Sequence, residues 1–391
     1  MLEAHPGLSG VYLLPDARDA FAARQLLAQT AERTLDVRYY IWRNDISGTL
    51  LFEALRAAAD RGVRVRLLLD DNNTSGLDPL LAALDSHPNI EVRLFNPFVI
   101  RAPRWIGYVT DFFRLDRRMH NKSFTADNLA TIVGGRNVGD EYFGARHGVL
   151  FADLDVLAIG PVVTEVSNDF DRYWASDSSY PLDRLLPAAD RALIEEVRTA
   201  ALRVESDPAA VDYVNALANS TFVREWSQGS LAPAWAVTHM ISDDPAKGLG
   251  LAAPEALLIE KLRGIIGESA TRVDLISPYL VPTSAGVDAF TALARRGVKI
   301  RVLTNALEAT DVAVVHAGYA KRRKTLLENG IALYELRRLS SDAAEKKDAR
   351  LGSSGSSLHA KTFSVDRSHF HRLVQLRSAL SKAQYRNGVC N

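Results

Sequence analysis

The chain has 391 residues, of which 47% are hydrophobic and 24% charged, a composition typical of a soluble globular protein of more than one domain. Its 47 basic and 47 acidic residues balance, so no global field gathers nucleic acid or an anionic membrane, and any basic surface is local. The single cysteine, Cys390, excludes disulfides and fits a reducing compartment. We find no apolar run long enough to cross a bilayer, and no signal peptide pattern at the start.

In the first half of the chain, β-branched apolar runs alternate with amphipathic stretches. The pattern predicts a helix at 162–174 and strands at 35–41, 63–69, 90–95, 121–126, 130–134 and 154–159. This alternation is typical of an α/β fold with a mixed, mainly parallel sheet covered by helices on both faces. The stretch 178–230 is polar and rich in proline, which indicates a connector with short helices.

The second half of the chain repeats the first. TLDVRYYIWRNDISG (34–48) resembles RVDLISPYLVPTSAG (272–286), and EALRAAADRGVRVRLLLDD (53–71) matches DAFTALARRGVKIRVLTN (288–305). The longer match predicts an amphipathic helix, a glycine stop at Gly62 or Gly297, and a buried strand. Tyr40 and Tyr279 lie 239 residues apart, and the two glycines 235 apart. The near-constant offset indicates one α/β unit used twice.

The duplication predicts the domain organisation. We expect a first lobe at 1–177, a connector at 178–234, a second lobe at 235–370 and an aberrant tail at 371–391.

A short motif, His-x-Lys-x-x-x-x-Asp, occurs once in each repeat. The first copy is His120, Lys122 and Asp127, and the second, 239 residues later, is His359, Lys361 and Asp366. On a strand, residues two apart point to the same face, so each motif directs an imidazole and an ammonium into one space. Two such pairs at a cleft between the lobes suit an anionic phosphodiester. The lysines hold its oxygens, one histidine attacks phosphorus and the other protonates the leaving oxygen.

With this motif doubled on a duplicated α/β unit, the chain resembles the phospholipase D superfamily, and more narrowly the bacterial cardiolipin synthases of type C. Stretches that carry the resemblance are VRYYIWRNDISG, VRVRLLLDDNNT, RRMHNKSFTAD, IVGGRNVGDEYFGA, FADLDVLAIGPVV, SDDPAKG, DVAVVHAGYAKRRK and SLHAKTFSVD. The resemblance implies a two-lobed fold with the active site at the lobe interface. It also implies phosphatidyl transfer through a phosphohistidine, without a metal or other cofactor.

The resemblance also implies residue roles. His120 and His359 are nucleophile and general acid/base, in an order left open, and Lys122 and Lys361 clamp the phosphate. Asn137 sits where the family places a phosphate-binding Asn. Asp153 sits where the family often has the carboxylate that orients a motif histidine. The motif aspartates, Asp127 and Asp366, complete the catalytic motif, and we interpret them as structural because they lie on the opposite strand face from the histidine.

The implied substrates are phosphatidylglycerol and a second phospholipid, reached from the cytoplasmic side of the bacterial inner membrane by a peripheral protein. No nucleic acid partner is expected, and a protein partner is left open. Two alternatives stand beside this function: a phosphodiesterase or nuclease that uses the same site, and a catalytically impaired fragment that binds phosphate or membrane.

The segment 96–120 combines aromatic residues with five arginines. It is either an interfacial element that meets lipid headgroups or a helix that packs its aromatic face on the lobe.

The tail departs from the family pattern. After Asp366 the family continues with a strand, Gly-Ser-x-Asn and a Glu, whereas this chain reads RSHFHRLVQLRSALSKAQYRNGVCN. Codons for 371–391, read one base later, permit Gly-Ser-Phe-Asn and Asn-Thr-Glu, so we interpret the tail as the result of a frameshift near Phe370. We expect 371–391 to be disordered or loosely helical and the sheet of the second lobe to be truncated. The chain should then be less active and less stable than a frame-restored form.

Overall fold

The computed structural model describes residues 2–146, 150–258, 260–261, 271–310, 313–337, 357–367 and 370–375. The chain divides into two compact units. The first unit comprises Met1–Arg146 and Leu154–Ala253, and the second comprises His147–Asp153 and Pro254–Asn391.

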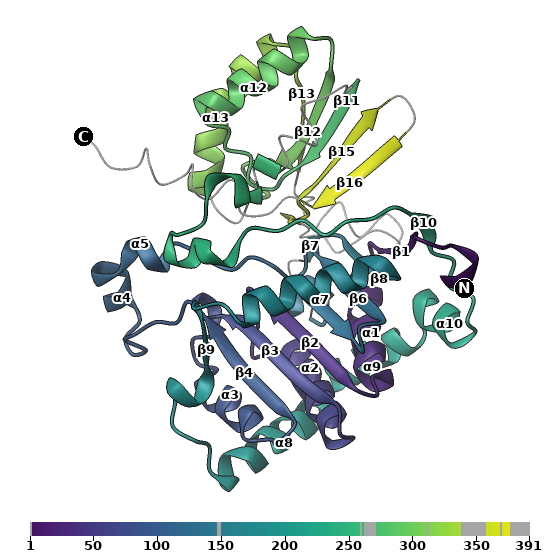
Figure 1. The fold of residues 1–391 in the computed structure, drawn as a ribbon, viewed down its shortest axis with the longest axis vertical. Helices are drawn as coiled ribbons and strands as arrows, with labels where there is room; N and C mark the ends of the chain where they lie inside the picture. The colour runs from purple at the N-terminus through teal and green to yellow at the C-terminus, as the bar shows by residue number, and fades with distance from the viewer. Residues whose placement is uncertain are drawn as a thin grey trace. The chain divides into compact units, whose positions relative to one another are not determined.

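The first unit is built on a nine-stranded mixed sheet (Figure 1). In spatial order its strands are β10 (Ala234–Ala236), β1 (Ser9–Leu14), β8 (Asp155–Ile159), β6 (Ala130–Gly134), β5 (Ser123–Ala126), β2 (Thr34–Tyr39), β3 (Arg64–Asp70), β4 (Ile90–Phe95) and β9 (Ser179–Pro181). The neighbours β2, β3 and β4 pair in parallel, and the other neighbouring strands pair antiparallel. The predicted strands of the first repeat are all present, and no strand end differs from its prediction by more than two residues.

Helices cover both faces of this sheet. The helices of the first unit are α1 (Ala17–Thr30), α2 (Ile46–Asp60), α3 (Asp78–Asp85), α4 (Trp105–Thr110), α5 (Phe112–Leu115), α6 (Asp140–Phe143), α7 (Pro161–Trp174), α8 (Arg191–Ser206), α9 (Pro208–Ala218) and α10 (Thr221–Ser227). Helix α7 packs on β2, β5, β6 and β8, and α1 and α2 lie on the opposite face (Figure 1). This unit also contains the short 3-10 helices η1 (Leu2–Ala4), η2 (Asp71–Asn73), η3 (Leu182–Arg184) and η4 (Pro245–Leu249), whereas η5 (Pro254–Ala256) belongs to the second unit.

Local sequence explains how helix α2 begins and ends. The Asp45 carboxylate caps its first turn by accepting a hydrogen bond from the Gly48 N–H at 2.9 Å. Gly62 follows its last turn with a φ of +93°, a conformation that glycine adopts without a steric penalty. The chain then enters β3, whose Val65, Leu67 and Leu68 are fully buried. The helix, glycine and strand of the repeat are therefore present as the sequence predicts.

Residues 178–253 belong to the first unit rather than forming a separate connector up to 234. Helix α8 packs on α2 and α3, helices α9 and α10 pack on α1, and β10 extends the sheet beside β1. The Tyr213 ring lies 5.4 Å from that of Phe21, and its hydroxyl donates to the carbonyl oxygen of Phe143 at 3.2 Å. These helices are amphipathic, and their apolar faces complete the core of the first unit.

The second unit repeats the centre of the first. Its five-stranded sheet has the order β13 (Ala332–Leu336), β12 (Lys299–Asn305), β11 (Arg272–Ile276), β15 (Thr362–Arg367) and β16 (Phe370–Gln375). Strands β11, β12 and β13 are parallel, and β15 and β16 are antiparallel additions, as β5 and β6 are beside β2. The order matches β4-β3-β2-β5-β6, which confirms the predicted α/β fold of two similar halves. The unit also contains α12 (Ser284–Arg295), α13 (Ala313–Glu328) and a small parallel sheet of β7 (Phe151–Ala152) and β14 (Ser357–Leu358).

The tail prediction is wrong for its first residues. Residues 370–375 form β16, which pairs antiparallel with β15 from Thr362↔Gln375 to Arg367↔Phe370. The pairing uses backbone N–H and C=O groups at the edge of β15, which can pair with a strand of almost any sequence. This segment also contains Phe370 and Val374, residue types that favour strands. Residues 376–391 lie outside the described residues.

A search of the described helices for a membrane-spanning segment found none of sufficient length and hydropathy.

Candidate active site

The first motif lies at the entrance to β5, beside the residue that follows β2. The His120 and Tyr40 rings are 4.0 Å apart between centroids and inclined by 37°. The Lys122 ammonium donates to the carbonyl oxygen of His120 at 3.1 Å and lies 5.5 Å from the centre of the Tyr40 ring. Tyr40 therefore contacts both the imidazole and the ammonium of the first motif.

The second motif has the same arrangement at the entrance to β15. The Lys361 ammonium donates to the carbonyl oxygen of His359 at 3.3 Å and lies 5.4 Å from the centre of the Tyr279 ring. Lys122 is only 5% exposed, and burying a cation is costly unless other groups replace its water. A carbonyl oxygen and the negative face of an aromatic ring partly do so. Sequence reasoning did not single out Tyr40 and Tyr279 as functional residues, although their separation of 239 residues was a signal.

Asp153 lies against the second motif histidine. Its Oδ2 is 2.6 Å from Nδ1 of His359, and both residues are buried. The contact arises because β7 pairs with β14, which aligns Ala152 with Leu358. The His359 N–H then donates to the carbonyl oxygen of Ala152 at 2.9 Å. Opposite an ionised carboxylate, Nδ1 carries the proton and Nε2 is left with its lone pair as the reactive nitrogen.

Asn137 lies inside the core of the first unit, where it is 1% exposed. Its Oδ1 accepts from the Ile41 N–H at 3.1 Å, and its Nδ2 donates to the Tyr142 hydroxyl at 3.0 Å. In this position Asn137 braces the chain directly after Tyr40. Its role as a phosphate ligand stays a prediction.

Asp127 lies in the turn between β5 and β6, with a φ of +53°. Its carboxylate accepts from the N–H groups of Glu32, Arg33 and Thr34 at 2.9, 2.8 and 2.7 Å, and so fixes the start of β2. Burial acts to raise its pKa, but the backbone donors outweigh burial and lower the pKa of Asp127. The side chain of Asp366, its counterpart in the second motif, lies outside the described residues.

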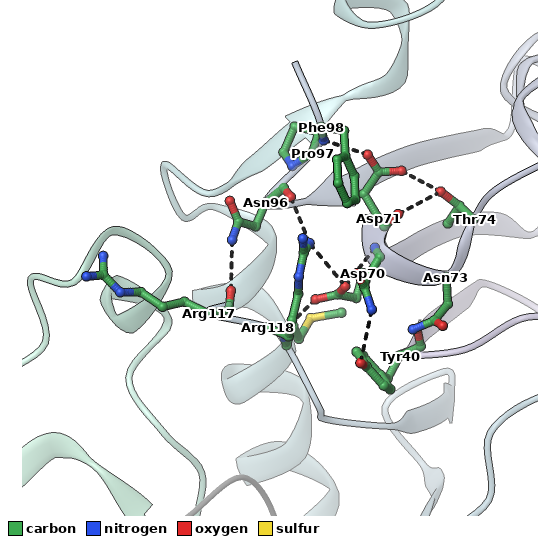
Figure 2. A network of polar contacts seen from close by, with 12 residues as sticks. Tyr40, Asp70, Asp71, Asn73, Thr74, Asn96, Pro97, Phe98, Arg117 and Arg118 are labelled. Atoms are coloured by element: carbon green, nitrogen blue, oxygen red, sulfur yellow. Dashed lines mark hydrogen bonds and ion pairs between the residues drawn. The ribbon is translucent and has the colours of Figure 1, made fainter. Parts of the chain in front are cut away.

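A buried carboxylate, Asp70, lies at the end of β3 in a network of polar contacts between Arg118 and Tyr40 (Figure 2). It accepts from the N–H of Met119, the residue before His120, at 2.7 Å and from the Asn72 N–H at 2.9 Å. Arg118 lies 3.4 Å away. Burial raises the pKa of Asp70 to about 6, although Arg118 acts in the opposite direction. The Asn72 side chain donates to the Tyr40 hydroxyl at 3.3 Å, which connects this network to the ring beside His120.

Each motif therefore supplies a buried or half-buried imidazole and an ammonium fixed by its own unit. Such groups can attack phosphorus, move a proton and stabilise negative charge. Within the described ranges, no three His, Cys, Asp or Glu side chains are grouped so that they could hold a metal ion.

A structural role for Asp127 predicts a loss of stability on substitution. In Asp127→Ala, the three N–H groups at the start of β2 lose their acceptor, which should lower the free energy of unfolding by about 2–4 kcal/mol. Thermal unfolding followed by circular dichroism should show a melting temperature several degrees lower. An unchanged melting temperature together with impaired catalysis would instead support the catalytic role.

The raised pKa of Asp70 predicts a pH-dependent stability. The unfolded carboxyl titrates near 4 and the folded one near 6, so between these values the folded chain binds more protons and becomes less stable as pH rises. Relative to Asp70→Asn, which does not titrate, the natural chain should gain about 2 kcal/mol between pH ~7 and pH ~4. Parallel melting curves of both proteins across this range test the prediction, and a constant difference would contradict it.

The match to known proteins covers both repeats of the chain. Residues 24–174 and 262–374 match the family model described as cardiolipin synthase, PLD-like domain. The chain is 54% identical over 363 residues to cardiolipin synthase C of Escherichia coli (strain K12), which covers 93% of this chain and 76% of that protein. It is 32% identical over 370 residues to an uncharacterized protein of Helicobacter pylori (strain J99), which covers 93% of this chain and 72% of that one.

Among solved structures, the phosphatidylserine synthase of Haemophilus influenzae Rd KW20 resembles this chain with a TM-score of 0.57 and 13% identity. The likeness covers 91% of this chain and 76% of that one and concerns the fold. The family match spans both repeats and includes both motifs, and the identity to a family member extends over nearly the whole chain. The chain therefore belongs to the cardiolipin synthase family of PLD-like domains.

Proposed function

We propose that this protein transfers a phosphatidyl group from one phospholipid to phosphatidylglycerol and so forms cardiolipin. The observation that carries the proposal is the repeated His–Lys pair, held in the same way at the same strand position in each unit. The 54% identity to a protein named cardiolipin synthase C supports the choice of substrate.

The proposed reaction has two displacement steps. In the first, Nε2 of one motif histidine attacks the donor phosphorus, the bond from phosphorus to the headgroup oxygen breaks, and the other histidine protonates that oxygen. In the second, the other histidine removes a proton from a phosphatidylglycerol hydroxyl, which attacks phosphorus and releases the first histidine. The two steps leave both histidines in their starting states.

The remaining site residues support this chemistry. Lys122 and Lys361 stabilise the charge that grows on the non-bridging oxygens. Asp153 orients His359 and stabilises its protonated form, since the carboxylate lies 2.6 Å from Nδ1. Both imidazoles must reach the same phosphorus, so the proposal requires the two motifs to share one active site.

Loss of either histidine should abolish transfer. His120→Ala and His359→Ala each remove either the attacking or the protonating imidazole. Each variant should therefore lower the rate of transfer by roughly a thousandfold or more. Lys122→Ala should lose most of the activity for electrostatic reasons. Cardiolipin would be measured by mass spectrometry after incubation with phosphatidylglycerol and phosphatidylethanolamine, both for this chain and for a form frame-restored after Phe370.

His87→Ala is the matched control, because the His87 side chain hydrogen-bonds to Asp60 and to the Asn89 N–H and to neither motif. This variant should retain full activity. Near-normal cardiolipin formation in either motif variant would refute the assigned chemistry.

We also propose that segment 98–113 is the contact with the membrane, on the cytoplasmic side of the inner membrane. Four of its apolar side chains face solvent: Val99, Trp105, Val109 and Phe113 are 86, 66, 76 and 82% exposed. The segment is anchored from behind, because Arg101 binds both Asp71 and Asp78. Because these aromatic and aliphatic side chains are exposed while the segment is held in place, we favour a contact with lipid headgroups over a helix that packs its aromatic face on the lobe.

Replacing exposed apolar residues of this segment should weaken membrane binding. The double variant Trp105→Ser, Phe113→Ser should bind vesicles of phosphatidylglycerol and phosphatidylethanolamine at least roughly tenfold more weakly, since two large side chains no longer enter the bilayer. Vesicle sedimentation measures the effect. Leu202→Ser, which changes an apolar residue of α8 that is 58% exposed, serves as the control. Equal binding by both variants would contradict the assignment.

A further inference from the structure

Asp70 and Asn305 occupy the same place in the two repeats. Each is the last residue of its strand, β3 or β12, and they lie 235 residues apart, as Gly62 and Gly297 do. Both side chains are buried, with exposures of 0% and 1%. A buried polar side chain therefore occupies this position in both halves.

Both side chains bind the backbone of the residue before a motif histidine. Asp70 Oδ2 accepts from the N–H of Met119, which precedes His120, at 2.7 Å. Asn305 Oδ1 accepts from the N–H of Leu358, which precedes His359, at 2.9 Å. Asn305 also donates through Nδ2 to the Leu358 carbonyl oxygen at 2.9 Å.

Strand direction explains why this contact is possible twice. Strand β5 runs antiparallel to β2, so its beginning lies at the edge where the parallel strands β2 and β3 end. Strand β15 stands in the same relation to β11 and β12. A side chain at the end of the second parallel strand therefore reaches the backbone that enters the motif strand.

We propose that Asp70 and Asn305 are equivalent positioning residues, each of which fixes the backbone beside one motif histidine and so sets the direction of its imidazole. The inference rests on the proposed function for its catalytic consequence, but the contact itself belongs to each unit. The shared property of the two residues is a buried oxygen acceptor, because one is a carboxylate and the other an amide. Displacing a reacting group by about 1 Å can cost roughly a hundredfold in rate.

The first repeat has an aspartate at this position and the second an asparagine, so Asp70→Asn is a conservative variant that the chain itself suggests. Asp70→Asn keeps the acceptor for the Met119 N–H and should retain most of the turnover rate. Asp70→Leu and Asn305→Leu remove the acceptor and should lower kcat roughly a hundredfold with little change in KM, since the lysines that hold phosphate are untouched.

A second readout does not depend on turnover. Modification of each histidine by diethyl pyrocarbonate, followed by peptide mass spectrometry, reports how freely each imidazole reacts. Asp70→Leu should change the modification rate of His120 roughly threefold or more and leave His359 unchanged, and Asn305→Leu should do the reverse. Thr131→Val is the control, because it removes a buried side-chain hydroxyl of the first unit that contacts Thr125. This variant should change the modification rate of neither histidine.

The two readouts separate the possible failures. Selective changes in histidine modification without any cardiolipin formation would support the positioning role and refute the proposed function. Unchanged modification in both leucine variants, or equal changes at both histidines, would overturn the positioning role whatever the activity. Full kcat in Asp70→Leu would overturn it as well.

Discussion

The direction of the strands around each motif is the constraint on which the candidate site depends. An antiparallel strand begins at the edge where its parallel neighbours end, so β5 and β15 begin beside the ends of β2 and β11. Residues from distant parts of a repeat therefore meet at one edge without long loops. In the first unit this edge gathers Tyr40, Asp70 and His120, and the backbone of the motif is fixed before any ligand binds.

Burial of the charged groups is the second physical theme. A buried ammonium is stable only if protein groups replace its water, and in both units a histidine carbonyl oxygen and a tyrosine ring face the motif lysine. The repeated arrangement indicates that each lysine is held at the same place in its unit by the same two kinds of contact. The Asp153 carboxylate likewise holds the His359 imidazole in place through its contact with Nδ1. A site built from dipoles and charges in fixed positions needs little reorganisation during the reaction.

The sequence predicted the α/β class, the strands of the first repeat and the duplication, because apolar periodicity and glycine stops are local signals. It did not predict that α8, α9 and α10 complete the first core, since their apolar faces have meaning only against α1, α2 and α3. The pairing of β16 also escaped prediction, because backbone pairing tolerates an irregular side-chain pattern. The resemblance implied that Asp153 orients a motif histidine, but the sequence did not tell which one, since 206 residues separate Asp153 from His359.

The central claim is that one motif histidine carries the phosphatidyl group between the two steps. The most direct measurement is to mix the protein with a short-chain phospholipid donor, quench within a turnover, digest, and locate phosphorylated peptides by mass spectrometry under alkaline conditions that preserve phosphohistidine. The account predicts a phosphatidyl adduct on a ring nitrogen of His120 or His359 that disappears when phosphatidylglycerol is added. Turnover without an adduct, or an adduct on any other residue, would contradict it.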